Sequence, residues 1–200
     1  RFSGAIPVAR HLLLIGGGHS HVEVIRCFAA APEPGVEVTL VSPGRFTAYS
    51  GMLPGHIAGH YSHADCHIDL LALCRRAGVR LIEDAVDRLD PDRRVAASRT
   101  AGELHYDVVS LDAGSTPATA NIAGAAEHGI PVKPVPVLLQ RWARLREQAR
   151  GAERELRIAV AGAGAAGVEI LLSMQYRIAA DGGRARFTLL SDGPDILAAQ

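Results

Sequence analysis

The sequence contains few cysteines and no cysteine pair. Its three cysteines are Cys27, Cys66 and Cys74, and none of them stands in a C-x-x-C or C-x-x-x-x-C spacing. A disulfide framework, a zinc ribbon and a redox dithiol therefore all lack support. We expect a reducing, cytoplasmic environment.

The chain also lacks an excess of charge and a long apolar run. Lys and Arg total 21 and Asp and Glu total 21, so nucleic acid is not an expected partner. The longest apolar run near the start, Leu12 to Ile15, is far shorter than the roughly 20 residues of a membrane-spanning helix. No signal peptide precedes it, and we expect no transmembrane segment. With 48% hydrophobic residues, the 200-residue chain has enough apolar content for a globular core.

A β–α–β pattern opens the chain. The run 12–15 reads as a buried strand, and the glycines 16–18 follow it at once. Apolar residues at helical spacing then run from 22 to 29, and a β-rich segment, 36–41, ends at Ser42. This unit has the usual length of a parallel β–α–β motif.

The middle of the chain changes character. Residues 45–61 read as an irregular loop with at most a short helix, and residues 68–77 as a helix that ends at Gly78. Short β candidates follow, and their turn residues suit an antiparallel meander inserted into an α/β domain. These candidates are residues 79–82, 85–89, 94–97 and 106–111.

The first pattern is repeated near the end. A proline-rich connection, 117–136, and a helix over 137–150 lead to a strand over 156–161. A glycine turn, a helix over 168–180 and a strand over 187–190 complete it. The predicted fold class is α/β: a Rossmann-like domain with a parallel sheet and an inserted β-meander, followed by the start of a second Rossmann-like domain. The predicted boundaries are 1–117 for the first domain, 118–155 for the connection and helix, and 156–200 for the second domain.

The second glycine turn is a full G-x-G-x-x-G formed by Gly162, Gly164 and Gly167. Such glycines permit a tight turn, close approach to a pyrophosphate and close packing of helix on strand. The helix amides then face the phosphates. Glu169 lies on the first helical turn, where it faces a ligand or simply favours the helix dipole. The alternative is a glycine-rich turn without a ligand.

The first glycine turn departs from this pattern. Gly16 and Gly18 are in place, but His21 stands where the third glycine belongs, so we expect its helix to lie further from the strand. Ser42 stands where an acidic residue usually binds the adenosine ribose, and Ser191 and Asp192 occupy that place in the second unit. Two such turns imply two dinucleotides, a hydride donor and a bound acceptor, and FAD with NAD(P)H is the economical pair.

In these motifs the chain resembles the pyridine nucleotide-disulfide oxidoreductase superfamily of two-dinucleotide-binding flavoproteins. Residues 16–18 look like its FAD pyrophosphate loop, and residues 162–169 like its NAD(P)H loop with the trailing glutamate. Residues 112–117 look like its A-T-G-S-x-P motif, with Asp112 and Ala113 in place of Ala-Thr.

Within that superfamily, the missing cysteine pair argues against disulfide reductases. The absence of cysteine after residue 118 weakens a sulfide:quinone reductase interpretation. Residues 39–53 are instead similar to a loop of type II NADH dehydrogenases. Three segments, 16–23, 49–61 and 131–134, resemble the NADH-dehydrogenase-like flavoprotein domain that in some bacteria is fused ahead of selenide, water dikinase. That resemblance implies a link to selenium metabolism and a fused or associated dikinase domain as partner.

The resemblance implies an FAD-dependent NAD(P)H oxidoreductase that passes electrons from flavin to a small-molecule acceptor. Flavin carries the chemistry, so no catalytic residue and no metal ligand is assigned. Lys133 is either a contact to flavin or acceptor or a solvent-facing lysine, and homo-oligomerisation stays open. The cofactor-binding candidates are Gly16, Gly18, His19 and Ser20 at the FAD pyrophosphate, Ser42 at its ribose, Met52 and Leu53 at the ring, Gly114 in the short motif, and Gly162, Gly164, Gly167 and Glu169 for NAD(P)H.

Two other interpretations stay open. His56, His60, His63 and His67 would share one face of a continuous helix and bind zinc or nickel, although Gly55 and Gly59 oppose such a helix. The chain would otherwise be a non-catalytic nucleotide-binding or partner-docking module. Because it begins at Arg1 and lacks the superfamily's later G-D segment, we expect part of a longer protein that binds FAD weakly or not at all by itself.

Overall fold

The computed structural model describes residues 9–117, 119 and 122–197. The chain folds into two compact units. Of the described residues, unit 1 combines 9–47 with 67–114, and unit 2 combines 48–66 with 115–117, 119 and 122–197. The chain thus enters unit 2 twice.

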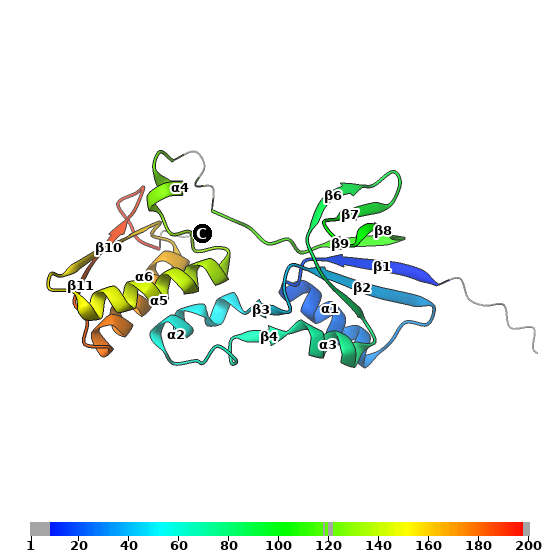
Figure 1. Ribbon diagram of the computed structural model, residues 1–200, viewed down its shortest axis with the longest axis horizontal. Helices are drawn as coiled ribbons and strands as arrows, with labels where there is room; N and C mark the ends of the chain where they lie inside the picture. Colours follow the sequence, from blue (N-terminus) through cyan, green and yellow to red (C-terminus); the bar gives the residue numbers. More distant parts are fainter. Residues whose placement is uncertain (1–8, 118, 120–121, 198–200) are drawn as a thin grey trace, which may run out of the picture. The chain divides into compact units, whose positions relative to one another are not determined.

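A four-stranded parallel sheet forms the centre of unit 1 (Figure 1). Its strands are β1 (Arg10–Ile15), β2 (Val36–Ser42), β5 (Arg80–Glu83) and β9 (Val108–Leu111), in the order β5-β2-β1-β9. In chain order this is 3-2-1-4, the arrangement of one half of a Rossmann fold. The α/β fold class is confirmed, and the carboxyl ends of all four strands meet at one edge.

Two helices cover one face of this sheet. The helix α1 (His19–Ala30) follows the first glycine turn, and α3 (Leu70–Ala77) precedes β5. Leu14 and Leu40 point from the sheet into the core that these helices close. Asp69 begins α3 as its N-cap, because its carboxylate accepts hydrogen bonds from the amides of the second and third residues of the helix.

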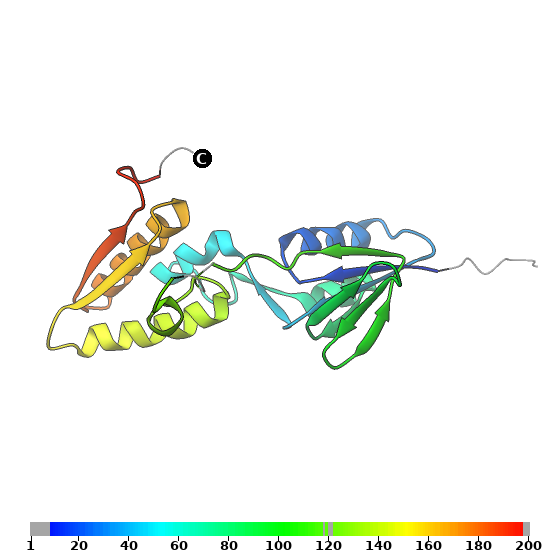
Figure 2. The same cartoon turned by 90° about the horizontal axis from the view of Figure 1, so that it is seen from above.

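An antiparallel meander covers the opposite face, as Figure 2 shows for α1 and the meander. It consists of β6 (Val86–Asp90), β7 (Val95–Ser98) and β8 (Gly102–His105). Leu13 and Val41 point from the sheet toward it and are completely buried. The central strands are therefore apolar on both faces, which explains their unbroken hydrophobic runs.

Two strands predicted for the meander belong elsewhere, and one meander strand was missed. Residues 79–82 and 106–111 contribute β5 and β9, which are parallel members of the main sheet. The third meander strand, β8, begins at Gly102, which the sequence indicated as a turn. A run of four apolar residues has the same pattern in either kind of sheet, so its partner could not be predicted locally. The predicted helix over 68–77 also begins later, at Leu70.

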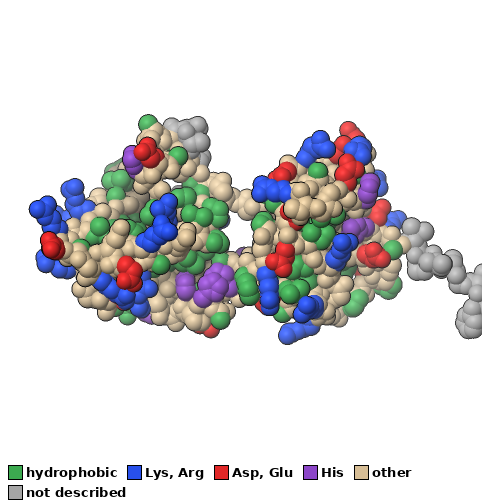
Figure 3. All heavy atoms as spheres, in the orientation of Figure 1, with side chains coloured by type: hydrophobic (Ala, Val, Ile, Leu, Met, Phe, Trp, Pro, Cys, Tyr) green, Lys and Arg blue, Asp and Glu red, His purple; other side chains and the backbone are tan. Residues whose placement is uncertain are grey.

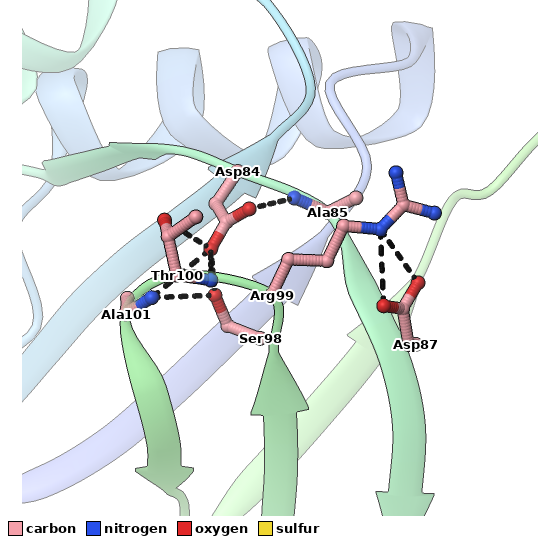
Figure 4. A network of polar contacts seen from close by, with 7 residues as sticks. All are labelled: Asp84, Ala85, Asp87, Ser98, Arg99, Thr100 and Ala101. Atoms are coloured by element: carbon pink, nitrogen blue, oxygen red, sulfur yellow. Dashed lines mark hydrogen bonds and ion pairs between the residues drawn. The ribbon is translucent and has the colours of Figure 1, made fainter.

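A buried carboxylate ties the meander to the main sheet (Figure 4). Asp84 follows β5 and accepts hydrogen bonds from the amides of Ala85 at 2.8 Å, Thr100 at 2.7 Å and Ala101 at 3.1 Å. The hydroxyls of Ser98 and Thr100 also donate to it. The Ser98 hydroxyl and the Thr100 amide are the main causes that hold the pKa of Asp84 well below its usual range.

We expect Asp84→Asn to lower the melting temperature by about 4 °C or more at neutral pH. The asparagine side chain has an NH2 group in place of one carboxylate oxygen, and this group cannot accept the hydrogen bonds that the five surrounding donors offer. The folded-state pKa of Asp84 is depressed, so its contribution is present above its unfolded pKa and is lost as pH falls through the folded value. The difference between the two proteins should therefore shrink from about pH 4 downward.

Thermal unfolding followed by circular dichroism at several pH values measures this difference. Asp87→Asn is the matched control, since Asp87 pairs with Arg99 at 3.0 Å on the exposed side of the same network. Equal melting temperatures of Asp84→Asn and wild-type protein at neutral pH would contradict the assignment.

Unit 2 contains a second parallel β–α–β motif. It consists of β10 (Leu156–Ala161), α6 (Ala165–Ala180) and β11 (Ala185–Leu190). The long helix α5 (Val135–Gly151) precedes it. The remaining elements are η1 (Ser50–Met52), α2 (Leu53–Ala58) and α4 (Ala125–His128), with β3 (Phe46–Ala48) and β4 (His67–Asp69) pairing where the chain passes between the units.

The core of unit 2 lies between α2, α5 and α6. The segment 53–58 thus joins helices that lie more than 75 residues later in the chain. The buried members are Leu53 and Ile57 from α2, Leu138, Trp142 and Ala149 from α5, and Ile170, Met174 and Ile178 from α6.

A buried carboxylate joins α5 to α6 in this unit. Asp181 receives ion pairs from Arg146 at 2.7 Å and from Arg150 and Arg177 at 3.0 Å. Burial raises the pKa of Asp181, but the three guanidinium groups outweigh it and the pKa lies below its usual value.

None of the helices formed by the described residues is long and apolar enough to cross a membrane.

On the face drawn in Figure 3, basic and acidic side chains are interspersed over unit 1.

Candidate functional site

The first glycine turn connects β1 to α1 at the carboxyl edge of the sheet in unit 1. Gly16 has φ +98°, and a Cβ atom added to it would overlap the backbone oxygen of Asp112. A Cβ atom on Gly17 would lie 2.5 Å from Leu70 Cδ1 and 2.7 Å from Ser42 Oγ. Neither position has room for a side chain, so the backbone itself forms the surface at the start of α1.

His21 replaces the third glycine and fills the space beneath the turn. Its side chain is 1% exposed. Nδ1 donates a hydrogen bond of 2.6 Å to the backbone oxygen of Gly16, and Nε2 shares one of 2.9 Å with the hydroxyl of Ser110 on β9. The sequence identified His21 as a departure from the motif, but not these partners.

Asp112 lies at the N-terminus of α1, although it follows β9. Its amide donates to the backbone oxygen of Ile15 at 2.8 Å, which extends the sheet pairing by one bond. Its Oδ2 accepts from the amide of His21 at 3.3 Å, and a Cβ atom on Gly18 would overlap this carboxylate. Ser110, His21 and Asp112 do not form a hydrolytic triad, because Asp112 contacts the backbone amide of His21 and not its ring.

Four other candidates for FAD binding lie at or near the same edge. Ser42 ends β2, is 5% exposed and donates from its hydroxyl to the backbone oxygen of Gly44 at 3.1 Å. His19 and Ser20 are the first residues of α1 and are exposed. Gly114 follows β9 with φ +72°. Ligands of open parallel sheets bind at this edge, so the predicted FAD residues of unit 1 are brought together.

The second glycine turn connects β10 to α6 in unit 2. Gly162 has φ +104°, and Gly164 is the N-cap of α6. A Cβ atom on Gly167 would overlap the backbone oxygen of Gly162. The equivalent oxygen in the first turn accepts a hydrogen bond from the His21 ring instead. In the second turn the helix therefore lies closer to its strand than in the first, as expected from the third glycine.

A pocket of about 100 Å³ lies beside α6 in unit 2. Leu53, Lys133 and Glu169 line it together, although they come from three distant segments of the chain. Lys133 Nζ donates to the hydroxyl of Ser115 at 3.3 Å. Met52 directly precedes α2 and is not among the lining residues. The other lining residues are Ser50, Pro54, Val132, Val135, Ala166 and Ile170.

The histidines of residues 56–67 do not share one helix face. Helix α2 ends at Ala58, and Gly59 continues in the left-handed conformation with φ +87°. The rings of His56 and His63 meet edge to face with centroids 6.3 Å apart, and Figure 3 shows histidine side chains grouped on the face drawn. Among the described residues, no three His, Cys, Asp or Glu side chains form a group that would hold a metal ion. The continuous-helix interpretation is therefore wrong.

Two units, each with a glycine turn between a parallel strand and a helix, define a protein of the double Rossmann type. The family model for pyridine nucleotide-disulphide oxidoreductase matches residues 10–199, and the chain belongs to this family. The cofactors of the family are FAD and NAD(P)H.

Solved structures of several oxidoreductases share this fold. They include a sulfide:quinone oxidoreductase of Aquifex aeolicus (TM-score 0.70, 19% identity, 90% of this chain and 43% of that one). For NDH2 of Plasmodium falciparum, the TM-score is 0.73 and the identity 17%, and the match covers 94% of this chain and 43% of NDH2. The water-forming NADH oxidase of Lactobacillus brevis has a TM-score of 0.74 at 18% identity and covers 94% and 41%.

This chain thus spans less than half the length of these three proteins. A comparison with curated protein sequences finds no match. At such identities the structural likeness establishes the fold.

Proposed function

We propose that this chain acts in an FAD-dependent NAD(P)H oxidoreductase of the NADH dehydrogenase type. The observation that carries this proposal is the pair of glycine turns, each placed between a parallel strand and the N-terminus of a helix in a member of this family. We assign residues 1–117 to the FAD side, residues 118–155 to the connection and residues 156–200 to the NAD(P)H side, although residues 48–66 fold as part of unit 2.

Residues of unit 1 fit the adenosine half of FAD. Gly16 and Gly17 have no room for side chains of their own, which suits close approach of their backbone to a pyrophosphate. Gly18, His19 and Ser20 begin α1, where backbone amides face an anion. Ser42 offers a hydroxyl oxygen to the ribose at the end of β2, and Gly114 lies at the end of β9. When bound, FAD supplies an acceptor for hydride from NAD(P)H.

Residues of unit 2 fit the nicotinamide nucleotide. Gly162, Gly164 and Gly167 place the N-terminus of α6 toward a pyrophosphate. Leu53, Lys133 and Glu169 line the pocket beside α6. We propose that Glu169 orients the nicotinamide amide there, and that Met52 and Leu53 lie at the flavin ring.

The electron acceptor is a small molecule in this proposal. The three segments that resemble the flavoprotein domain of selenide, water dikinase fusions support an association with that enzyme and with selenium metabolism. Size-exclusion chromatography of the protein mixed with a selenide, water dikinase tests the association, and co-elution is the expected result.

Visible absorbance of the purified protein tests the oxidoreductase proposal. Flavin bands that bleach when NADH is added without oxygen are the expected result. A protein that binds NADH but no flavin, in the chain as given and in any longer chain that contains it, would favour the non-catalytic nucleotide-binding module instead.

Glu169→Gln tests the role of the pocket. We expect the KM for NADH to rise about tenfold, because a neutral acceptor replaces a charge-assisted hydrogen bond to the nicotinamide amide. Flavin content should stay unchanged, since the residues that we assign to the FAD pyrophosphate and ribose lie in unit 1. Steady-state reduction of an artificial electron acceptor measures the effect, and Glu153→Gln on the exposed loop before β10 is the control. An unchanged KM would remove Glu169 from the nicotinamide site.

A further inference from the structure

We propose that the carboxylate of Asp112 lowers the affinity of unit 1 for FAD by occupying the position at the N-terminus of α1 that the pyrophosphate requires. This inference rests on the proposed binding of FAD by unit 1. It concerns how tightly the cofactor is held, which the proposed function leaves open.

The geometry places this carboxylate inside the turn. A Cβ atom on Gly18, the second glycine, would overlap the carboxylate of Asp112. The second glycine is the position at which the backbone of such a turn approaches a pyrophosphate. Asp112 Oδ2 also accepts from the amide of His21, the third residue of α1, so the carboxylate already uses one of the amides that face an anion.

The negative charge of the Asp112 carboxylate opposes binding of a pyrophosphate at this position. The N-terminus of a helix stabilises an anion, and the carboxylate of Asp112 provides one from within the protein. A pyrophosphate that enters the turn must displace this carboxylate or lie beside it. If the two lie side by side, their negative charges repel each other. Either route weakens binding relative to a turn without the carboxylate.

The two turns of the chain differ in how closely a neighbouring strand approaches their first glycine. Asp112 reaches the turn of unit 1 because β9 pairs with β1 and ends directly beside Gly16. At Gly162, the first glycine of the turn in unit 2, an added Cβ atom would meet nothing within 4 Å. At the first glycine, the described residues thus crowd the turn of unit 1 and not that of unit 2.

The same contact has a second, opposite effect. The carboxylate caps the amide of His21, so it stabilises α1 in the absence of a ligand. Removing its charge should therefore leave the free protein equally stable or less stable while it strengthens the binding of FAD. A residue with a purely structural role would change the stability without strengthening binding.

Asp112→Asn in the protein freed of flavin tests this inference, because the amide keeps the shape and one hydrogen-bond acceptor while it removes the charge. We expect the Kd for FAD, measured by quenching of flavin fluorescence, to fall about tenfold. Asp107→Asn is the matched control at the opposite end of β9, where the carboxylate accepts from the amide of His11 at 2.7 Å. It should change the Kd less than about twofold.

The dependence of the Kd on salt is a second test of this repulsion. Added sodium chloride screens like charges, so it should lower the Kd of the wild-type protein more than that of Asp112→Asn. Asp112→Ser is a second variant, because it retains a hydrogen-bond acceptor in less volume.

The outcomes separate this inference from the proposed function. A Kd for Asp112→Asn that equals or exceeds the wild-type value would overturn the inference while FAD binding stands. An increase in particular would show that Asp112 holds the turn in its binding conformation. If neither protein binds FAD, in the chain as given and in a longer chain that contains it, both the proposed function and the inference fail.

Discussion

Replacement of Gly167 by alanine is expected to weaken the binding of NAD(P)H by at least about a hundredfold. An added Cβ atom would overlap the backbone oxygen of Gly162, which lies at the start of the same turn. Because the obstacle is backbone and not a flexible side chain, α6 must move away from β10. Its amides would then no longer point at the pyrophosphate.

Titration calorimetry with NADH measures this loss, and flavin absorbance reports whether unit 1 is affected. Gly151→Ala is the matched control in unit 2, since a Cβ atom there would meet nothing within 4 Å and its φ is not positive. Wild-type affinity for NADH in Gly167→Ala would show that the turn has room for a side chain and would refute the geometry described here.

Restoring the family glycine at position 21 is expected to destabilise the protein. His21→Gly should lower the free energy of unfolding by about 3 kcal/mol, because it empties a buried site and leaves two polar groups without their partner. These groups are the backbone oxygen of Gly16 and the hydroxyl of Ser110. Glycine near the start of α1 also costs conformational entropy.

Urea unfolding followed by circular dichroism measures this change. His105→Ala on β8 is the control, because it removes an exposed histidine side chain from the same unit. We expect the control to lie close to wild type. Equal or greater stability of His21→Gly would mean that the first turn closes as tightly as the second one.

The sequence by itself determined the two glycine turns and the elements beside them. Strands end directly before Gly16 and Gly162, and helices begin within three residues of each. These signals are local: a run of apolar residues, glycines at fixed spacing and a change to helical periodicity. For the same reason the sequence indicated the α/β class and the family.

Pairing between distant segments was decided by the tertiary structure. The strand beginning at Arg80 and the strand beginning at Val108 joined the parallel sheet, although their short apolar runs suited the meander equally. Residues 48–66 became part of unit 2, where Leu53 and Ile57 found apolar helix faces to pack against. Segments pair where pairing buries their apolar surface, and this burial depends on the whole chain and not on any one segment.

The contacts of the candidate site also depended on the folded chain. Asp112 meets the amide of His21 only because β9 pairs with β1 and brings residues 91 positions apart together. Lys133 and Glu169 line one pocket only because α6 packs beside the segment that precedes α5. The sequence could name these residues from their types and motifs. Their distances from one another, and thus the contacts that they make, are properties of the tertiary structure.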